Sequence, residues 1–183
     1  MKQYLNLLEK TLEEGKWQQN RTGVPTKRLA GGMLEFDLKD SFPAVTTKKL
    51  AFNAVKGELI GFIRGYDTAE QFRSLGCKVW DQNANENQMW LDNPYRMGHD
   101  HLGRIYGVQW RSWTPPGEFG VDNEIDQLAN AVRDIIHNPT SRRILVTAWN
   151  PGELDQMALP PCHMTYQLLV DVESNELSLC MYQ

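Results

Sequence analysis

The stretch MTYQLLVDVESNELSLCM, residues 164–181, carries a clear structural signal. Its two apolar runs, 164–171 and 176–181, have the composition of β-strands, and Glu173-Ser174-Asn175 between them is typical of a turn. Residues 144–149 have a similar strand-like composition. The C-terminal part of the chain is therefore predicted to contain consecutive strands.

Helical spacing of apolar residues predicts three helices. Leucines recur at helical intervals over residues 2–15, and residues 125–136 form an amphipathic pattern before a proline. A further helix is predicted from Thr47 to about Gly65, with an apolar stripe along one face. The stripe consists of Phe52, Val55, Leu59, Phe62 and Ile63.

Two other segments complete the predicted organisation. Residues 33–38 nearly alternate between apolar and acidic side chains, which predicts a half-exposed strand. Residues 81–103 are polar and rich in asparagine, and we expect a long irregular segment there. This order of helices and strands indicates an α+β class, in a single domain that spans residues 1–183.

The composition argues against several classes of function. The chain has 183 residues and a net charge of -4, so we expect no general attraction to nucleic acid or anionic membranes. No stretch reaches the roughly eighteen apolar residues that span a bilayer, and the N-terminus lacks the apolar core of a signal peptide. Three cysteines without a CxxC pair fit a reducing cytoplasm. No histidine pair has metal-ligand spacing, so no metal is predicted.

Cys162 is a candidate nucleophile. It lies in the run LPPCH, residues 159–163, where two prolines restrict the backbone before the thiol. A thiolate is a strong nucleophile, so this run favours covalent chemistry on a phosphorylated small molecule. The alternative is a buried structural cysteine, because free cysteines are common in protein cores.

Glu58 lies at the edge of the apolar stripe on the helix predicted from Thr47. A carboxyl group that borders an apolar face tends to have a raised pKa, which suits general acid–base catalysis near neutral pH. The alternative is a boundary glutamate that pairs with a lysine such as Lys56, or that stays in contact with water.

Arginines and aromatic residues supply candidate binding groups. Arg142-Arg143 follows a predicted helix and could hold a phosphate through forked hydrogen bonds, as could Arg21 in its Thr-Gly loop. Each of these arginines could equally be a solvated surface charge. The middle of the chain is rich in aromatic residues, which could stack on a nucleobase or a flat cofactor, or could form an ordinary core.

Taken together, these segments resemble the thymidylate synthase family, in the same order along the chain from Tyr4 to Gln183. The most specific segment is AWNPGEL, residues 148–154, which leads to MALPPCH, residues 157–163. The other matching segments are RTG (21–23), FPAVTTKK (42–49), GELIGFIRG (57–65), VWD (79–81), GRIYGVQWR (103–111) and SRRI (141–144). The resemblance implies a sandwich in which helices pack on a mixed sheet.

The resemblance further implies a methyltransferase that converts dUMP to dTMP, with methylenetetrahydrofolate as co-substrate and no metal. The Cys162 thiolate would add to carbon six of the uracil ring, which makes carbon five nucleophilic. Carbon five would then attack the one-carbon unit of the folate. A hydride from the folate would complete the methyl group and leave dihydrofolate.

The resemblance also implies a group of catalytic residues around the thiol. Glu58 and its bound waters would relay protons, and Tyr106 would help to remove the proton from carbon five. Asn150 would belong to the hydrogen-bond network near the nucleophile, and His163 is counted with the catalytic residues.

The folate and the phosphate would be held by further residues. Val79 and Trp80 would pack on the folate ring, and Lys48 would contact its glutamate tail. In the family, the equivalent of Arg21 binds the phosphate of its own subunit's dUMP, whereas the equivalents of Arg142 and Arg143 reach across from the partner subunit. A cytoplasmic homodimer with twofold symmetry is therefore implied, with no need for a membrane or nucleic acid.

The family pattern continues beyond the position of Gln183, so we expect the chain to be C-terminally incomplete. The segment beyond this position would hold the residues that read the base and bind the ribose. Two alternatives to the synthase stay open. One is a deoxypyrimidine hydroxymethylase, and the other is an inactive fragment that binds nucleotide or a partner chain.

Overall fold

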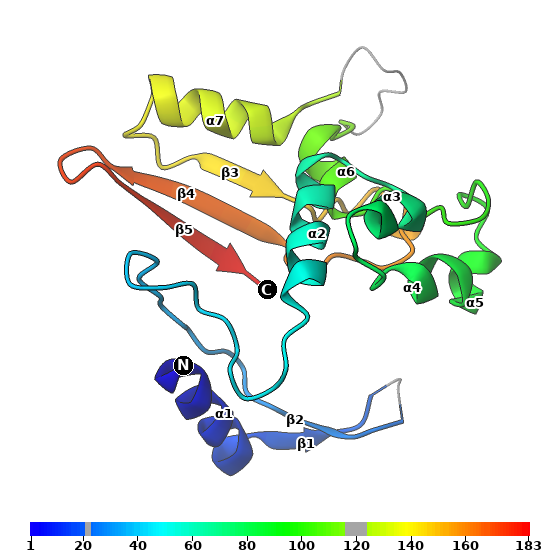
Figure 1. Ribbon diagram of the computed structural model, residues 1–183, viewed down its shortest axis with the longest axis horizontal. Helices are drawn as coiled ribbons and strands as arrows, with labels where there is room; N and C mark the ends of the chain where they lie inside the picture. The colour runs from blue at the N-terminus through cyan, green and yellow to red at the C-terminus, as the bar shows by residue number, and fades with distance from the viewer. Residues whose placement is uncertain (21–22, 116–123) are drawn as a thin grey trace. The chain divides into compact units, whose positions relative to one another are not determined.

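The computed structural model describes residues 1–20, 23–115 and 124–183 (Figure 1). The chain divides into two compact units, Met1–Ala51 and Phe52–Gln183, and each is described by itself. All of the sheet that was predicted from residues 144–181 lies in the second unit.

The first unit consists of one helix and a small hairpin. Helix α1 spans Lys2–Glu14, which confirms the helix predicted over residues 2–15. Strands β1 (Lys16–Gln18) and β2 (Thr26–Arg28) pair in antiparallel fashion. The strand predicted over residues 33–38 is wrong, because this segment has no ladder partner in the described part of the chain. Its backbone bonds to a side chain instead, and the N–H of Glu35 donates to Gln3 Oε1 at 2.8 Å.

The second unit is built on a three-stranded antiparallel sheet with the order β3-β4-β5. Strand β3 spans Ile144–Thr147, β4 spans Thr165–Asp171 and β5 spans Glu176–Tyr182. These bounds confirm the three C-terminal strands, and Asn175 adopts a left-handed conformation (φ 56°) in the turn between the last two. The α+β class is confirmed, and every strand pairing in the described ranges is antiparallel.

The helices of the second unit lie beside β3 and beyond one end of the sheet, and β5 is exposed (Figure 1). They are α2 (Phe52–Ile63), α3 (Ala69–Ser74), α4 (Asp81–Asn85), α5 (Gln88–Leu91), α6 (Tyr106–Arg111), α7 (Gln127–His137) and a short 3-10 helix (Leu154–Gln156). Helix α7 runs alongside β3 and confirms the predicted amphipathic helix. The prediction of an irregular segment over residues 81–103 is wrong in part, since α4 and α5 lie within it.

Helix α2 differs from its prediction in its start and in its buried face. It begins at Phe52 instead of Thr47. Among the residues of the predicted stripe, Phe62 is buried, whereas Leu59 and Ile63 are exposed. The buried positions include two glycines of α2 instead, which pack closely against the segment that follows the helix.

Aromatic side chains form the centre of the second unit's core. Phe62 stacks on Tyr106 with a centroid distance of 4.7 Å, and it meets Phe72, Trp80 and Trp110 in edge-to-face geometry. All five rings are buried. Such contacts add to the stabilisation that burial of the ring area supplies. The aromatic-rich middle of the sequence is therefore largely a core.

An ion-pair cluster fixes the loop that follows α5. Asp100 adopts a left-handed conformation (φ 64°), and its carboxylate accepts hydrogen bonds from Arg73 at 3.0 Å and from Asn85 at 2.8 Å. Arg73 also donates to Asp81 at 2.8 Å. The hydrogen bond from Arg73 lowers the pKa of Asp100 to about 2.

We expect Asp100→Asn to destabilise the protein by about 1.5–3 kcal/mol at pH 7, because it removes a charged acceptor from Arg73 while keeping a residue type that tolerates positive φ. The native pKa of about 2 lies below the usual value of 3.8, so this stabilisation is present above about pH 4 and is lost as the pH falls toward 2. Urea unfolding of both proteins between pH 2 and 7 measures the difference. A difference in unfolding free energy that stays constant over this pH range would contradict the stabilising role of the Asp100 carboxylate.

Candidate active site

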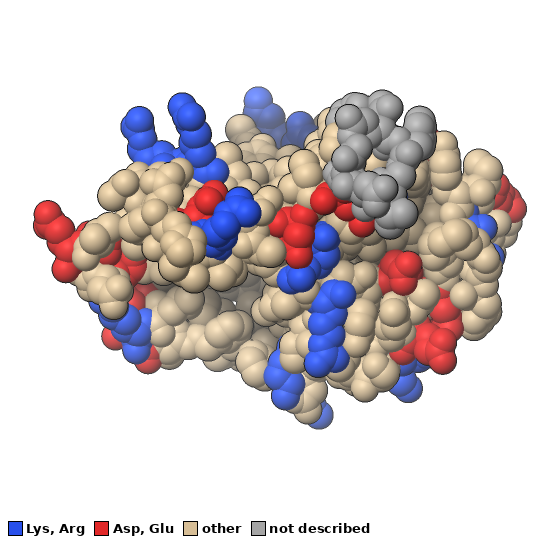
Figure 2. All heavy atoms as spheres, turned by 90° about the horizontal axis from the view of Figure 1, so that it is seen from above, with Lys and Arg blue, Asp and Glu red and all other residues tan. Residues whose placement is uncertain are grey.

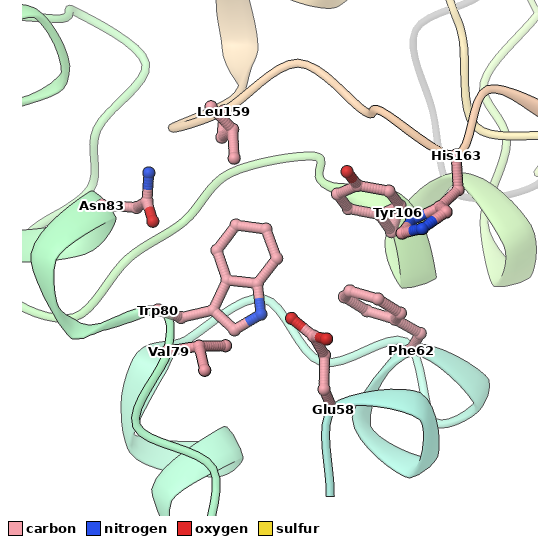
Figure 3. Close-up of a pocket in the computed structure, with 8 residues that line it drawn as sticks. All are labelled: Glu58, Phe62, Val79, Trp80, Asn83, Tyr106, Leu159 and His163. Atoms are coloured by element: carbon pink, nitrogen blue, oxygen red, sulfur yellow. The ribbon is translucent and has the colours of Figure 1, made fainter. Parts of the chain in front are cut away.

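A pocket of about 180 Å³ opens in the second unit beside the aromatic core (Figure 3). Its lining residues are Glu58, Phe62, Val79, Trp80, Asn83, Tyr106, Leu159 and His163. They come from α2, from α4 and the segment that leads into it, from α6, and from the segment that leads into β4. The pocket thus brings together five predicted site residues, which are Glu58, Val79, Trp80, Tyr106 and His163.

Glu58 points into this pocket between the rings of Trp80 and Phe62 (Figure 3). Desolvation by burial raises the pKa of Glu58, and the nearby indole N–H of Trp80 offsets part of this shift. Trp80 is 4% exposed, and its Nε1 atom is buried without a hydrogen-bond partner among the described residues. A carboxyl group with a raised pKa can take up and release protons closer to neutral pH, and the indole nitrogen of Trp80 points toward this carboxyl group (Figure 3).

Tyr106 and Cys162 are joined by a hydrogen bond. The backbone N–H of Cys162 donates to the Tyr106 hydroxyl oxygen at 2.6 Å. Burial raises the pKa of Tyr106 to about 12, so its hydroxyl stays protonated at neutral pH. Because that oxygen accepts from Cys162, the hydroxyl hydrogen can be donated to another group.

Two of the cysteines differ sharply in environment. Cys162 is exposed and forms no disulfide, whereas Cys77 is buried. The structural alternative that the sequence left open therefore applies to Cys77 and not to Cys162. The ring of His163 lies 5.9 Å from the ring of Tyr106, and desolvation by burial lowers its pKa. His163 is thus disposed to be neutral at pH 7.

Asn150 is buried and takes part in a hydrogen-bond network below the pocket. Its Nδ2 atom donates to Glu153 Oε2 at 3.1 Å, and its Oδ1 atom accepts from the N–H of Gly152 at 3.2 Å. Glu153 also accepts from Arg104 and Gln109, both at 2.7 Å. The sequence analysis did not identify Glu153, because these last two partners lie 49 and 44 residues away along the chain.

Of the predicted phosphate and folate-tail residues, Arg142 and Arg143 belong to the same unit as this pocket. Arg142 and Arg143 are exposed just before β3 and are not among the lining residues. Lys48 is exposed and belongs to the first unit, and Arg21 lies outside the described residues. The pocket adds Phe62, Asn83 and Leu159, to which the sequence analysis gave no role in the site.

The wider surface carries mixed charge. Basic and acidic side chains are interspersed on the face shown in Figure 2. Within the described ranges, no group of three or more His, Cys, Asp or Glu side chains is arranged so that it could hold a metal ion. In the same ranges, none of the helices has both the length and the apolar character needed to cross a bilayer.

Comparison with known proteins places the chain in a family. The family profile described as "Thymidylate synthase" matches residues 2–183. The thymidylate synthase of Pseudomonas putida is 48% identical over 214 residues, and that of Bordetella parapertussis is 47% identical over 212 residues. Both alignments cover the whole chain and 66% of the relative, so the chain spans just under two thirds of these relatives. The thymidylate synthase of Idiomarina loihiensis is 42% identical, with the whole chain and 63% of the relative covered. On the strength of the profile and these identities, the chain belongs to the thymidylate synthase family.

Proposed function

We propose that this chain supplies the thiol nucleophile and the proton-transfer groups of a thymidylate synthase, which forms dTMP and dihydrofolate from dUMP and methylenetetrahydrofolate. One observation carries the proposal. The exposed cysteine Cys162 is bonded through its backbone N–H to Tyr106, which lines a pocket together with the half-buried carboxyl group of Glu58. Cys162 is not itself a lining residue, but its neighbour His163 is, so the candidate nucleophile lies beside the space that holds the proton donor and the carboxyl group.

The chain's own residues support each step of this reaction. The Cys162 thiolate would form a bond to carbon six of the uracil ring, and the electron pair of the ring double bond would move toward carbon five. After carbon five has bound the one-carbon unit, Tyr106 would assist removal of its proton. Glu58, with its raised pKa, would pass protons to and from the ring through water. The carbon–sulfur bond then breaks and releases the thiolate.

The pocket fits a flat heteroaromatic ring. Trp80 and Phe62 provide apolar walls, and the buried N–H of Trp80 points toward the carboxyl group of Glu58 at the edge of the space (Figure 3). When bound, methylenetetrahydrofolate supplies the one-carbon unit and the hydride. Val79 and Trp80 would hold its ring and exclude water, and Lys48 would contact its glutamate tail.

We also propose a homodimer in which each site needs both subunits. Arg142 and Arg143 are exposed and lie away from their own pocket, which leaves their side chains available to a partner's phosphate. Arg21 would bind the phosphate within its own subunit. Forked hydrogen bonds from arginines are well matched to phosphate oxygens. Asn150 would act through its buried hydrogen bonds, and His163 through its contact with Tyr106.

We expect Cys162→Ser to lower tritium release from carbon five of labelled dUMP, in the presence of methylenetetrahydrofolate, by more than about a thousandfold. Cys180→Ser is the matched control, because Cys180 is also exposed but lies in β5, outside the segment that bonds to Tyr106. It should retain activity. Absence of release from the unchanged chain would favour a binding fragment, and hydroxymethyl product without dihydrofolate would favour a hydroxymethylase.

Mixing two inactive variants tests the shared site. A Cys162→Ser chain and an Arg142→Ala/Arg143→Ala chain should each be inactive. When the two are unfolded and refolded together, half of the dimers are mixed, and each mixed dimer regains one complete site. Activity should therefore return to about a quarter of that of the unchanged protein. No recovery from a properly folded mixture would show that the arginines serve their own subunit or neither.

We expect Glu58→Gln to lower turnover by about 10²–10⁴-fold while it stabilises the protein at pH 8. Since the folded state raises the pKa of Glu58, its contribution to stability is present below about pH 4.5 and is lost as the pH rises through the folded pKa. The glutamine carries no charge to desolvate, so its advantage should grow with pH. Thermal unfolding from pH 4 to 8 measures this, with exposed Glu9→Gln as the control. A gain in stability of Glu58→Gln that does not grow with pH would contradict the raised pKa of Glu58.

A further inference from the structure

One carboxylate oxygen in the second unit gathers three side-chain donors. Glu153 Oε2 accepts from Arg104 Nε at 2.7 Å, from Gln109 Nε2 at 2.7 Å and from Asn150 Nδ2 at 3.1 Å. Glu153 is 9% exposed, and Gln109 is fully buried. Hydrogen bonds to an ionised acceptor are stronger than those between neutral groups, so this oxygen is a rigid point in the interior.

On one side, the network holds the start of α6. Arg104 comes just before this helix, Tyr106 is its first residue, and Gln109 lies one turn further along. Gln109 Nε2 also donates to the backbone oxygen of Arg104 at 2.9 Å. The carboxylate of Glu153 therefore binds both ends of the turn that carries Tyr106.

On the other side, the network holds the segment that ends at Cys162. The backbone N–H of Gln156 donates to Glu153 O at 3.0 Å, and the N–H of Arg104 donates to Gln156 O at 2.9 Å. Two residues further on, the N–H of Ala158 donates to Leu102 O at 2.9 Å. Only the short run Leu159-Pro160-Pro161 then separates this anchored segment from Cys162.

We propose that Glu153 is a positioning residue, whose carboxylate fixes α6 and the segment 154–162 relative to each other. It thereby keeps the Tyr106 hydroxyl within 2.6 Å of the Cys162 N–H. Glu153 is not among the residues that line the pocket, so it acts through Tyr106 and Cys162 and not on substrate. The catalytic consequence rests on the proposed function, whereas the structural coupling does not.

Amide hydrogen exchange tests the coupling without any substrate. Protein labelled with ¹⁵N-cysteine reports on three amides, including that of Cys162 and that of Cys77, which donates to Phe72 O at 3.1 Å. In Glu153→Gln, the ratio of the Cys162 exchange rate to the Cys77 exchange rate should rise about tenfold, as expected for one weakened hydrogen bond. The matched control is Asp171→Asn, which loses a charged acceptor for the backbone N–H groups of Glu173 and Ser174 in the turn between β4 and β5. It should leave this ratio within about twofold. An unchanged ratio in Glu153→Gln, or an equal rise in both variants, would overturn the proposal.

A second variant and a kinetic measurement complete the test. If Glu153→Gln does not fold, Arg104→Lys removes the same link from a side chain that is 23% exposed, because lysine cannot bond Glu153 and Thr114 together as the guanidinium does. Its exchange ratio should rise in the same way. In either variant kcat should fall about tenfold or more with KM changed less than threefold. A rise in KM alone would overturn the positioning role. Absence of turnover in the unchanged chain would refute the proposed function, but the exchange measurement would still test the structural coupling.

Discussion

The absence of side chains at two positions of α2 is the constraint on which the second unit depends. A Cβ atom at Gly57 would lie 2.5 Å from the backbone oxygen of Leu75, and one at Gly61 would lie 2.3 Å from the ring of Phe72. Only glycine permits so close an approach of this helix to its neighbours. The approach buries Phe62 among the aromatic rings, and it brings Glu58, the residue after Gly57, to the half-buried position that raises its pKa. The close packing of α2 is therefore the cause of the raised pKa of Glu58.

The carboxyl groups of Glu58 and Glu153 lie in different environments, and this difference decides what each can do. Glu58 faces a pocket, and desolvation dominates its surroundings. Glu153 lies in the interior with Arg104 beside it and with two amide donors on the same oxygen. A carboxyl group that is desolvated in a cleft is suited to exchanging protons, whereas one saturated with donors is suited to holding chain segments in place. The same residue type therefore serves two purposes in neighbouring parts of one fold.

The sequence predicted the elements whose patterns are local. The strands β4 and β5 followed from two apolar runs around a polar turn, and α1 and α7 followed from helical spacing. Helix α3 was missed although its capping box is visible in the sequence, since Gln71 follows Thr68 by three residues and the two bond reciprocally. The strand expected over residues 33–38 failed because alternation says nothing about whether a partner strand exists. Within the site, the edge of an apolar stripe indicated Glu58 and the resemblance indicated Tyr106, but the role of Glu153 depends on contacts between distant segments that no local pattern reveals.

In the hydrogen bond between Cys162 and Tyr106, the tyrosine hydroxyl accepts one hydrogen and remains able to donate its own. As an acceptor, the Tyr106 hydroxyl steadies the backbone that carries the thiol, and as a donor it keeps one hydrogen for a reacting partner. Replacing Tyr106 by phenylalanine would remove the acceptor and the donor together, so the loss of activity caused by that single change combines two effects. Its two components become separable only through residues that disturb the geometry and leave the hydroxyl intact. Variants of remote network members such as Glu153 are therefore more informative about the proposed role of Cys162.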